Sequence, residues 1–353
     1  MRPNKIFLPV ASIINIFIII LLLTHSAKSD ENKIKFFAND KGVLSIMYHR
    51  FNESKYPSTN IQMEIFKKHI DIIKKKKYSF LNPIDFDKNF LKIKTNKEIL
   101  ITIDDGFSSF YEHAWPYLKS NKIPFILFIS TEAVGKNGYM NWEQIKEIER
   151  ENFAFIGNHS HSHEYLLEFN FDKFESDILK SIEIFKKNIG YNPIYFSYPF
   201  GEYSLSQKKY ILQKFNFAFG QHSGVIDTNK DKYELARFPI NEKYGDLKRF
   251  EFLVDLFPLQ YKNLLPEQKY INNSTNPPDF SVEFFKEQKN ISNINCFSDE
   301  GNKWEKSNVI IQKNTLKIKF RDKFLFRRGR INCSLNDNGV WRWFGVQYSV
   351  KTN

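Results

Sequence analysis

From residue 42 to about residue 257, short apolar segments alternate with amphipathic ones. Six apolar segments predict strands, at residues 43–47, 99–103, 125–129, 153–156, 194–198 and 217–219. The segments between them repeat apolar residues at the spacing of a helix that packs one face on a sheet. Because this alternation is typical of parallel strands, we expect an α/β fold with a largely parallel sheet. In such folds, chemistry collects where strands end and loops begin.

Two polar motifs come directly after predicted strands. Asp104 and Asp105 are adjacent and follow the strand predicted at residues 99–103. A His-Ser-His-Ser-His run follows another strand and places His159 and His163 four positions apart. Two histidines and one carboxylate can hold a divalent metal and leave a position open for water. A second carboxylate can take the proton of that water, so the two motifs predict metal-assisted hydrolysis.

Each motif also has a purely structural interpretation. Adjacent acidic residues before a glycine, here Gly106, are typical of a turn, and one backbone hydrogen bond can satisfy a buried histidine. Three histidines within five positions are harder to explain by packing alone. The middle one, His161, is expected to point away from the metal or to support a ligand from behind.

A third motif lies at the end of the predicted strand at residues 194–198. In chain order, residues 102–106 (TIDDG), 159–163 (HSHSH) and 198–201 (YPFG) resemble the motifs of the polysaccharide deacetylases, the carbohydrate esterases with a NodB homology domain. The resemblance covers about residues 42–257. It implies a distorted (β/α) barrel and a metal-dependent hydrolase that acts on an acetylated glycan.

The resemblance implies a role for each motif residue. Asp104 would be the general base. Three residues would hold one divalent metal ion, with Zn²⁺ favoured over other transition metals: Asp105, His159 and His163. The backbone N–H of Phe200 would help to stabilise the oxyanion of the tetrahedral intermediate.

Two departures from the family pattern concern the general base and the general acid. The arginine that commonly orients the base is missing before Pro199, and Arg237 is its candidate substitute. Arg237 is also predicted, together with Phe200, to bind substrate. The family's late Leu-x-x-His motif is not recognisable. Instead, Met-Tyr-His at residues 47–49 resembles the exported poly-β-1,6-N-acetylglucosamine deacetylases, in which the motif order is circularly permuted. His49 would then protonate the departing amine.

The pattern changes in the last quarter of the chain. Residues 263–279 are polar and rich in Asn and Pro, which predicts a linker between a deacetylase domain at residues 40–262 and a C-terminal module at residues 280–353. The module alternates with a period of two and has a turn sequence at residues 336–339 (NDNG). It is therefore predicted to be a small all-β module that resembles a sandwich.

The N-terminus predicts export. A positive start and an unbroken apolar run at residues 16–23 fit a signal peptide at residues 1–27. Polar residues and a proline interrupt the wider apolar stretch, so a cleaved signal is favoured over a retained anchor. The rest of the chain is expected to be periplasmic, secreted or membrane-anchored outside the cytoplasm. That compartment permits a disulfide between Cys296 and Cys333, with two unpaired buried thiols as the alternative.

The net charge of +12 raises the question of a nucleic-acid partner. Most basic residues are lysines spread along predicted helices, which is typical of a solvated surface. No nucleic-acid partner is expected for an exported chain. The expected partner is a polysaccharide or oligosaccharide substrate, and a membrane would be met only through an uncleaved N-terminal anchor.

Two alternative functions fit the same sequence features. An O-acetyl glycan esterase, including a xylan esterase, would use the same apparatus. A glycan-binding pseudoenzyme would fit the missing arginine and four aromatic residues that either stack on sugars or fill a core: Trp341, Trp343, Phe344 and Tyr348. The complete set of metal ligands and base counts against the pseudoenzyme. We therefore predict a hydrolase that removes N-acetyl groups from an extracytoplasmic N-acetylglucosamine polysaccharide and releases acetate.

Overall fold

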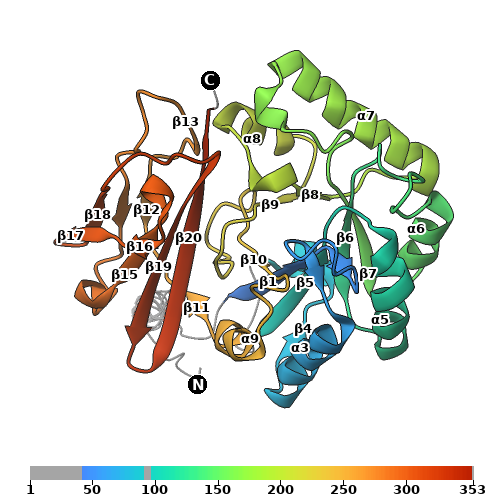
Figure 1. Ribbon diagram of the computed structural model, residues 1–353, viewed down its shortest axis with the longest axis horizontal. Helices are drawn as coiled ribbons and strands as arrows, with labels where there is room; N and C mark the ends of the chain where they lie inside the picture. Colours follow the sequence, from blue (N-terminus) through green and yellow to red (C-terminus); the bar gives the residue numbers. More distant parts are fainter. Residues whose placement is uncertain (1–41, 91–96, 352–353) are drawn as a thin grey trace, which may run out of the picture. The chain divides into compact units, whose positions relative to one another are not determined.

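The computed structural model describes residues 42–90 and 97–351 of the 353-residue chain (Figure 1). These residues belong to one compact unit. The signal peptide predicted at residues 1–27 lies outside the described residues. None of the described helices is both long enough and apolar enough to cross a membrane.

Residues 42–254, which we call the parallel region, are built on one sheet of eight strands. Seven strands follow the order β10-β1-β5-β6-β7-β8-β9, and β4 pairs with β5. Their bounds are β1 (Val43–Tyr48), β4 (Ser79–Phe80), β5 (Glu98–Ile103), β6 (Phe125–Ile129), β7 (Ala154–Asn158), β8 (Tyr195–Ser197), β9 (Phe217–Phe219) and β10 (Phe238–Pro239). Every pairing is parallel, so the strands end at one common edge. The predicted α/β fold, a distorted (β/α) barrel, is confirmed.

Both faces of this sheet are buried, which explains why its strands are apolar at successive positions. All six residues of β1 and five of the six in β5 are buried. Ile99 and Ile101 belong to one apolar core, whereas Leu100 and Ile126 belong to a second. Because alternate residues of a strand point to opposite faces, such runs are typical of parallel strands covered on both sides.

Helices connect these strands, and their ends follow local sequence signals. Asn141 and Gln144 form a capping box at the start of α6, and Gly190 ends α7 with a φ of 86°. The helices are α3 (Met63–Lys75), α4 (Pro83–Asn89), α5 (Trp115–Asn121), α6 (Trp142–Glu149), α7 (Phe171–Ile189), α8 (Leu205–Ile211) and α9 (Leu247–Val254). Shorter elements are the strand pair β2 (Arg50–Phe51) and β3 (Asn60–Ile61) and the single turns η3 (Phe110–Ala114), η4 (Leu166–Glu168), η5 (Pro199–Gly201), η6 (Ile291–Asn293) and η7 (Glu300–Asn302).

Residues 257–351, which we call the C-terminal region, form two further sheets. One has the order β11-β20-β19-β15-β16, with β13 paired to β20, and the other has the order β12-β14-β18-β17. Their bounds are β11 (Phe257–Pro258), β12 (Asn263–Leu265), β13 (Tyr270–Ile271), β14 (Ser281–Glu283), β15 (Asn295–Ser298), β16 (Glu305–Lys306), β17 (Asn308–Gln312), β18 (Thr315–Lys319), β19 (Arg328–Asp337) and β20 (Val340–Val350). The expected all-β character of this region is confirmed.

The segment expected as a linker and the two cysteines both contribute to these sheets. Residues 263–279 contain β12, which pairs with β14, and β13, which pairs with β20. This segment is therefore part of both sheets, while the domain boundaries themselves stay a prediction. Cys296 and Cys333 occupy paired positions of β15 and β19 and form a disulfide, with their Cα atoms 4.1 Å apart.

The four C-terminal aromatic residues divide between core and surface. Phe344 and Tyr348 are buried in the apolar core of the C-terminal region. Trp343 is half-buried and Trp341 is exposed. Two of the four thus fill the core, and they are not available to stack on a sugar.

Candidate active site

The residues predicted to carry the chemistry lie in loops at the carboxyl edge of the parallel sheet. The strands lead to His49 after β1, to Asp104 and Asp105 after β5, to His159 and His163 after β7, and to Phe200 after β8. Because these strands are parallel, their loops meet at the same edge. The fold thus brings together segments that are far apart in the sequence.

Asp105, His159 and His163 form the predicted metal cluster. Each offers one ligand atom, and these atoms lie within 4.8 Å of one another. Oδ1 of Asp105 is 3.3 Å from Nε2 of His159 and 3.1 Å from Nε2 of His163. Two imidazoles and one carboxylate with room for a further ligand are typical of a catalytic zinc site.

Two buried atoms in this cluster test whether a cation fits. Among the described side chains, Asp105 Oδ1 and His159 Nε2 are buried without a hydrogen-bond partner. Nδ1 of His159 lies 2.7 Å from the carbonyl oxygen of Ser197, which can only accept, so Nδ1 carries the proton. The lone pair of His159 therefore sits on Nε2 and faces Asp105. Buried polar atoms without partners are costly, and a divalent cation between these residues would satisfy both.

The backbone around the cluster takes up unusual conformations. Four residues that are not glycine have positive φ angles: Asp105 (74°), Ser160 (68°), His163 (55°) and Phe200 (59°). Such conformations cost on the order of 1–3 kcal/mol each and tend to cluster at active sites. The surrounding structure must hold them in place.

Helix α7 and strand β7 hold the histidine loop. Asp177, in α7, accepts the backbone N–H groups of His161 and Ser162 at 2.9 and 3.0 Å. Ser160 Oγ accepts the N–H of His163 at 3.1 Å, and Asn158 Oδ1 accepts the N–H of Ser160 at 2.8 Å. Backbone N–H groups of Thr131 and Glu132 also donate to the carbonyl oxygens of Ser160 and His161, so the loop that carries His163 is held from several sides.

His161 does not join the metal cluster. Its Nδ1 lies 2.9 Å from Thr131 Oγ1, and its Nε2 lies 4.0 Å from Glu132 Oε2. Both partners belong to the loop after β6. The middle histidine therefore links two loops and leaves the metal cluster to its neighbours.

Asp104 is fully buried and forms a two-pronged ion pair with Arg237. Arg237 Nη1 donates to Oδ1 at 2.6 Å, and Nη2 donates to Oδ2 at 2.8 Å. Burial raises the pKa of Asp104, but the charges of Arg237 and His159 lower it by more than burial raises it. The pKa of Asp104 therefore lies below its usual value. Arg237, the candidate substitute for the arginine missing before Pro199, is therefore the partner of Asp104 in the structure. The carboxylate stays ionised and has a fixed orientation.

The sequence-based assignment of Arg237 to substrate binding is wrong. Its side chain has no exposed surface, and its Nε donates to the carbonyl oxygen of Gly220 at 2.9 Å. Its Nη2 also donates to Ser197 Oγ at 2.8 Å. The N–H groups of its guanidinium thus donate to partners inside the protein, where its positive charge compensates the buried carboxylate of Asp104.

His49 lies next to the aspartate pair. The N–H of Asp104 donates to the carbonyl oxygen of Tyr48 at 2.9 Å, which places the following residue, His49, at the site. Burial lowers the pKa of His49, and this outweighs the opposing effects of the carboxylates of Asp105 and Asp104.

Phe200 connects the site to the C-terminal region. Its ring stacks on Tyr165 with centroids 4.4 Å apart and meets the ring of His163 edge-on at 4.8 Å. Its carbonyl oxygen accepts a hydrogen bond from Gln347 Nε2, in β20, at 3.0 Å, and the carbonyl of Gly201 accepts from the same atom at 3.3 Å. The turn η5 is therefore held from outside the parallel region.

Two adjacent arginines reach the same rim, and sequence reasoning missed them. Arg327 lies 3.6 Å above the ring of Tyr165, and its Nε donates to both carboxylate oxygens of Glu202 at 3.0 Å. Arg328 lies 5.5 Å from the ring centre of Phe200. Their partners are more than a hundred positions away, and a pair of arginines at a strand start carries no local signal of that contact.

The parallel sheet places a His₂Asp cluster beside a buried aspartate, and such a cluster could hold a divalent metal ion. Residues 92–219 match the family model described as polysaccharide deacetylase. The chain therefore carries a polysaccharide deacetylase domain and is a deacetylase enzyme, which confirms the family predicted from the three motifs. This match includes all three motifs but neither His49 nor Arg237.

Named relatives agree with that family. The poly-β-1,6-N-acetyl-D-glucosamine N-deacetylase of Staphylococcus aureus (strain MRSA252) is 24% identical over 276 residues, which are 69% of this chain and 94% of that protein. Among solved structures, the Streptococcus pyogenes deacetylase PplD in complex with acetate has a TM-score of 0.56 at 18% identity and covers 61% of this chain and 99% of that chain. IcaB from Ammonifex degensii has a TM-score of 0.53 at 24% identity, over 60% of this chain and 97% of that chain. The two structures support the fold.

Proposed function

We propose that this protein removes N-acetyl groups from an N-acetylglucosamine-containing polysaccharide outside the cytoplasm and releases acetate. The observation that carries the proposal is the buried, arginine-paired Asp104 beside the Asp105, His159 and His163 cluster. This arrangement offers a metal site and a separate base in one place. The similarity to a poly-β-1,6-N-acetyl-D-glucosamine N-deacetylase supports an amide of an amino sugar as the bond that is cleaved.

Three residues would hold one divalent ion, with Zn²⁺ favoured by the two imidazole ligands: Asp105, His159 and His163. When bound, such an ion polarises the acetyl carbonyl and lowers the pKa of water. The loop hydrogen bonds to Asp177 and the contact between His159 and Ser197 fix the directions of the ligand side chains.

Asp104 acts as the general base in this proposal. Its carboxylate is ionised because Arg237 compensates its charge, and the fork of two hydrogen bonds fixes its direction. Its Oδ2 lies 3.8 Å from Nε2 of His159, so a water molecule beside the metal ligands is within its reach. Asp104 takes the proton of that water as the water attacks the acetyl carbon.

His49 and Phe200 would complete the reaction. The N–H of Phe200 would stabilise the negative charge that develops on the acetyl oxygen. The left-handed backbone at this residue sets the direction of the peptide groups around it, and Gln347 holds its carbonyl. His49 would give a proton to the nitrogen that leaves, which yields a free amino sugar.

A location outside the cytoplasm is supported by the disulfide between Cys296 and Cys333. Such bonds persist in oxidising compartments. The predicted signal peptide at residues 1–27 points the same way from the sequence. Cell fractionation of the tagged full chain should place the protein in the exported fraction.

Acetate release from the metal-loaded full chain tests the function. We expect release from β-1,6-linked N-acetylglucosamine oligomers, at a higher rate than from β-1,4-linked oligomers or acetylated xylan. Asp105→Ala should lose both metal binding and activity, whereas Asp104→Asn should keep the metal and lose turnover. Release from xylan alone would identify an O-acetyl esterase instead. No release from any glycan by metal-loaded protein would favour a glycan-binding pseudoenzyme.

A further inference from the structure

One cleft has none of the proposed metal ligands in its lining, and we call it the aromatic cleft. It has a volume of about 480 Å³ and is lined by residues of both the parallel and the C-terminal region. Three of its aromatic side chains are exposed, Tyr244 (37%), Phe252 (38%) and Trp304 (45%). Large aromatic groups are normally buried, so three of them around one concave surface indicate a binding site.

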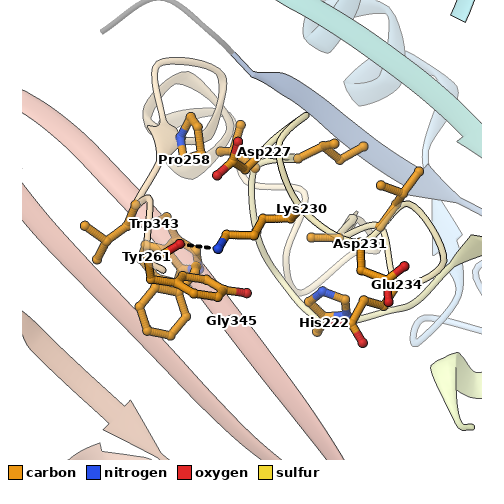
Figure 2. A pocket seen from close by; sticks show the side chains of 16 residues that line it. His222, Asp227, Lys230, Asp231, Glu234, Pro258, Tyr261, Trp343 and Gly345 are labelled. Carbon is orange, nitrogen blue, oxygen red and sulfur yellow. Dashed lines mark hydrogen bonds between the residues drawn. The ribbon is translucent and has the colours of Figure 1, made fainter. Parts of the chain in front are cut away.

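A neighbouring cavity is much smaller than the aromatic cleft. Figure 2 shows a smaller cavity in which Lys230 points toward Tyr261, and their hydrogen bond closes one side. That cavity has a volume of only about 60 Å³ and is crossed by the charged side chains of Lys230, Asp231 and Glu234. It is lined by residues of both regions and is too small for a sugar, whereas the aromatic cleft is large enough for a ligand.

The polar groups of the aromatic cleft indicate which kind of ligand fits. Gln221, Asn241 and Asn332 line it together with the aromatic residues. Flat aromatic faces stack on the apolar face of a sugar ring, while side-chain amides donate to and accept from hydroxyl and acetamide groups. This combination of amphipathic rings and amides suits a saccharide better than an apolar peptide.

The charge of the cleft narrows the choice further. Arg249 and Arg330 line it, and none of the described residues that line it is Asp or Glu. Asp299 lies behind Arg330, with 3.8 Å between the closest charged atoms, and balances it in part. A surface with two guanidinium groups repels a protonated amino sugar and accepts the neutral, acetylated form.

The cleft borders the active site. Gln221, at one end of the cleft, packs against Gly201 so closely that a Cβ on that glycine would lie 2.5 Å from the backbone nitrogen of Gln221. Gly201 follows Phe200 in the turn η5. At another side, Pro239 pairs with Met47, two residues before His49. Two residues that line the cleft thus contact segments next to the candidate active site.

We propose that the aromatic cleft binds acetylated units of the same glycan whose acetyl group is removed at the metal cluster, and that it disfavours units that have already lost theirs. This inference rests on the proposed function for the identity of the glycan. Its consequence is that the enzyme prefers to work beside acetylated stretches and releases segments that have become cationic.

Binding to the metal-loaded Asp104→Asn full chain tests the cleft without turnover. We expect a β-1,6-linked N-acetylglucosamine hexamer to bind, and its fully deacetylated form to bind at least tenfold more weakly at pH 6, where its amines are charged. Adding Trp304→Ala should weaken binding of the acetylated hexamer about tenfold, and Trp304→Phe should restore most of it. The matched control is Phe297→Ala, because Phe297 is equally exposed (45%) in the same region but does not line the cleft.

A charge variant tests the discrimination between the two forms. Arg330→Gln should reduce the preference for the acetylated hexamer about threefold, since one of two cationic groups is lost. Equal binding of both hexamers to the Asp104→Asn chain, or a Trp304→Ala chain that binds as tightly as its parent, would overturn the inference.

Kinetics of the otherwise wild-type chain separate this inference from the proposed function. Trp304→Ala should raise KM for the hexamer about tenfold and leave kcat/KM for a single-sugar substrate unchanged. Acetate release with no effect of Trp304 on KM would overturn the cleft and leave the deacetylase intact. Binding that depends on Trp304, in a wild-type chain that releases no acetate, would overturn the proposed function and support the cleft.

Discussion

The parallel region and the C-terminal region both reach the turn at Phe200, but they hold it in different ways. From the parallel region, Arg237 and Asp104 form a fully buried pair, and Arg237 also donates to Ser197, two residues before the turn begins. From the C-terminal region, Gln347 donates to the carbonyl oxygens of Phe200 and Gly201, and the half-buried Arg328 lies 5.5 Å from the ring centre of Phe200. Buried charges cannot be left unpaired, whereas contacts at a rim can be exchanged for water. The parallel region therefore carries the candidate site, and the C-terminal region contacts the turn beside it.

The largest expected effect comes from breaking the buried pair. Arg237→Ala leaves the charge of Asp104 uncompensated in the core and should cost about 3–5 kcal/mol of unfolding free energy, with activity reduced at least a hundredfold. Urea denaturation and acetate release measure the two losses. The double variant with Asp104→Asn should recover part of the stability and none of the activity. If the double variant were less stable than Arg237→Ala alone, the buried charge would not be the cause.

Removal of the disulfide tests the other region by itself. Replacing Cys296 and Cys333 by Ala should lower the unfolding free energy by about 2–4 kcal/mol, because the unfolded chain is no longer cross-linked. Metal binding at native conditions should not change, since both residues lie in the C-terminal sheets. As a control, wild-type protein that is denatured in the presence of a reductant should lose the same amount of unfolding free energy. A changed metal affinity would contradict the division of tasks between the two regions.

A pH titration examines a buried contact of the parallel region. His69 stacks on Phe250, and burial lowers its pKa to about 4. Because the unfolded chain takes up the proton near pH 6.5, stability should be constant above that pH and fall by about 2 kcal/mol between pH 6.5 and pH 4.5. His69→Gln should show a flatter profile over the same range, by chemical denaturation at each pH. An identical slope in both proteins would exclude His69 as the source.

The smallest effect is expected at the joint between the regions. Gln347→Leu removes the donor to the carbonyls of Phe200 and Gly201, which should lower kcat about fivefold while metal affinity stays constant. Gln312→Leu, at an exposed position of β17, is the matched control. Wild-type kcat in Gln347→Leu would mean that the C-terminal region does not position the turn.

The fold of the parallel region and its metal cluster could be predicted because their signals are local. A strand that is apolar at successive positions and is followed directly by Asp104 and Asp105 indicates both a buried strand and a reactive site within a few residues. The partner of Asp104 was harder to assign, since Arg237 lies 133 positions away, directly before the two-residue strand β10. Its motif context suggested a substitute arginine, but only the structure shows that its guanidinium is buried and unavailable to substrate.

The contribution of the C-terminal region could not be predicted, because long-range contacts leave no periodic pattern. Gln347 is one polar residue in an alternating strand, and its partner is 147 positions away. Residues 263–279 look like a linker because Asn and Pro are frequent in loops, yet the short strands β12 and β13 pair there. Composition describes a segment on its own and says nothing of its neighbours in space.

The parallel pairing of β11 with β20 has a consequence for how such genes can be inherited. Phe257 and Pro258, which close the deacetylase half of the chain, pair with Arg342 and Trp343 near its far end. A recombination event that cut between the two halves would separate this pairing and the support of Gln347 for the turn. We therefore expect the two halves to be inherited together. A chain that received only the first half would lack the partner strand of β11 and the hydrogen bond from Gln347 to the turn.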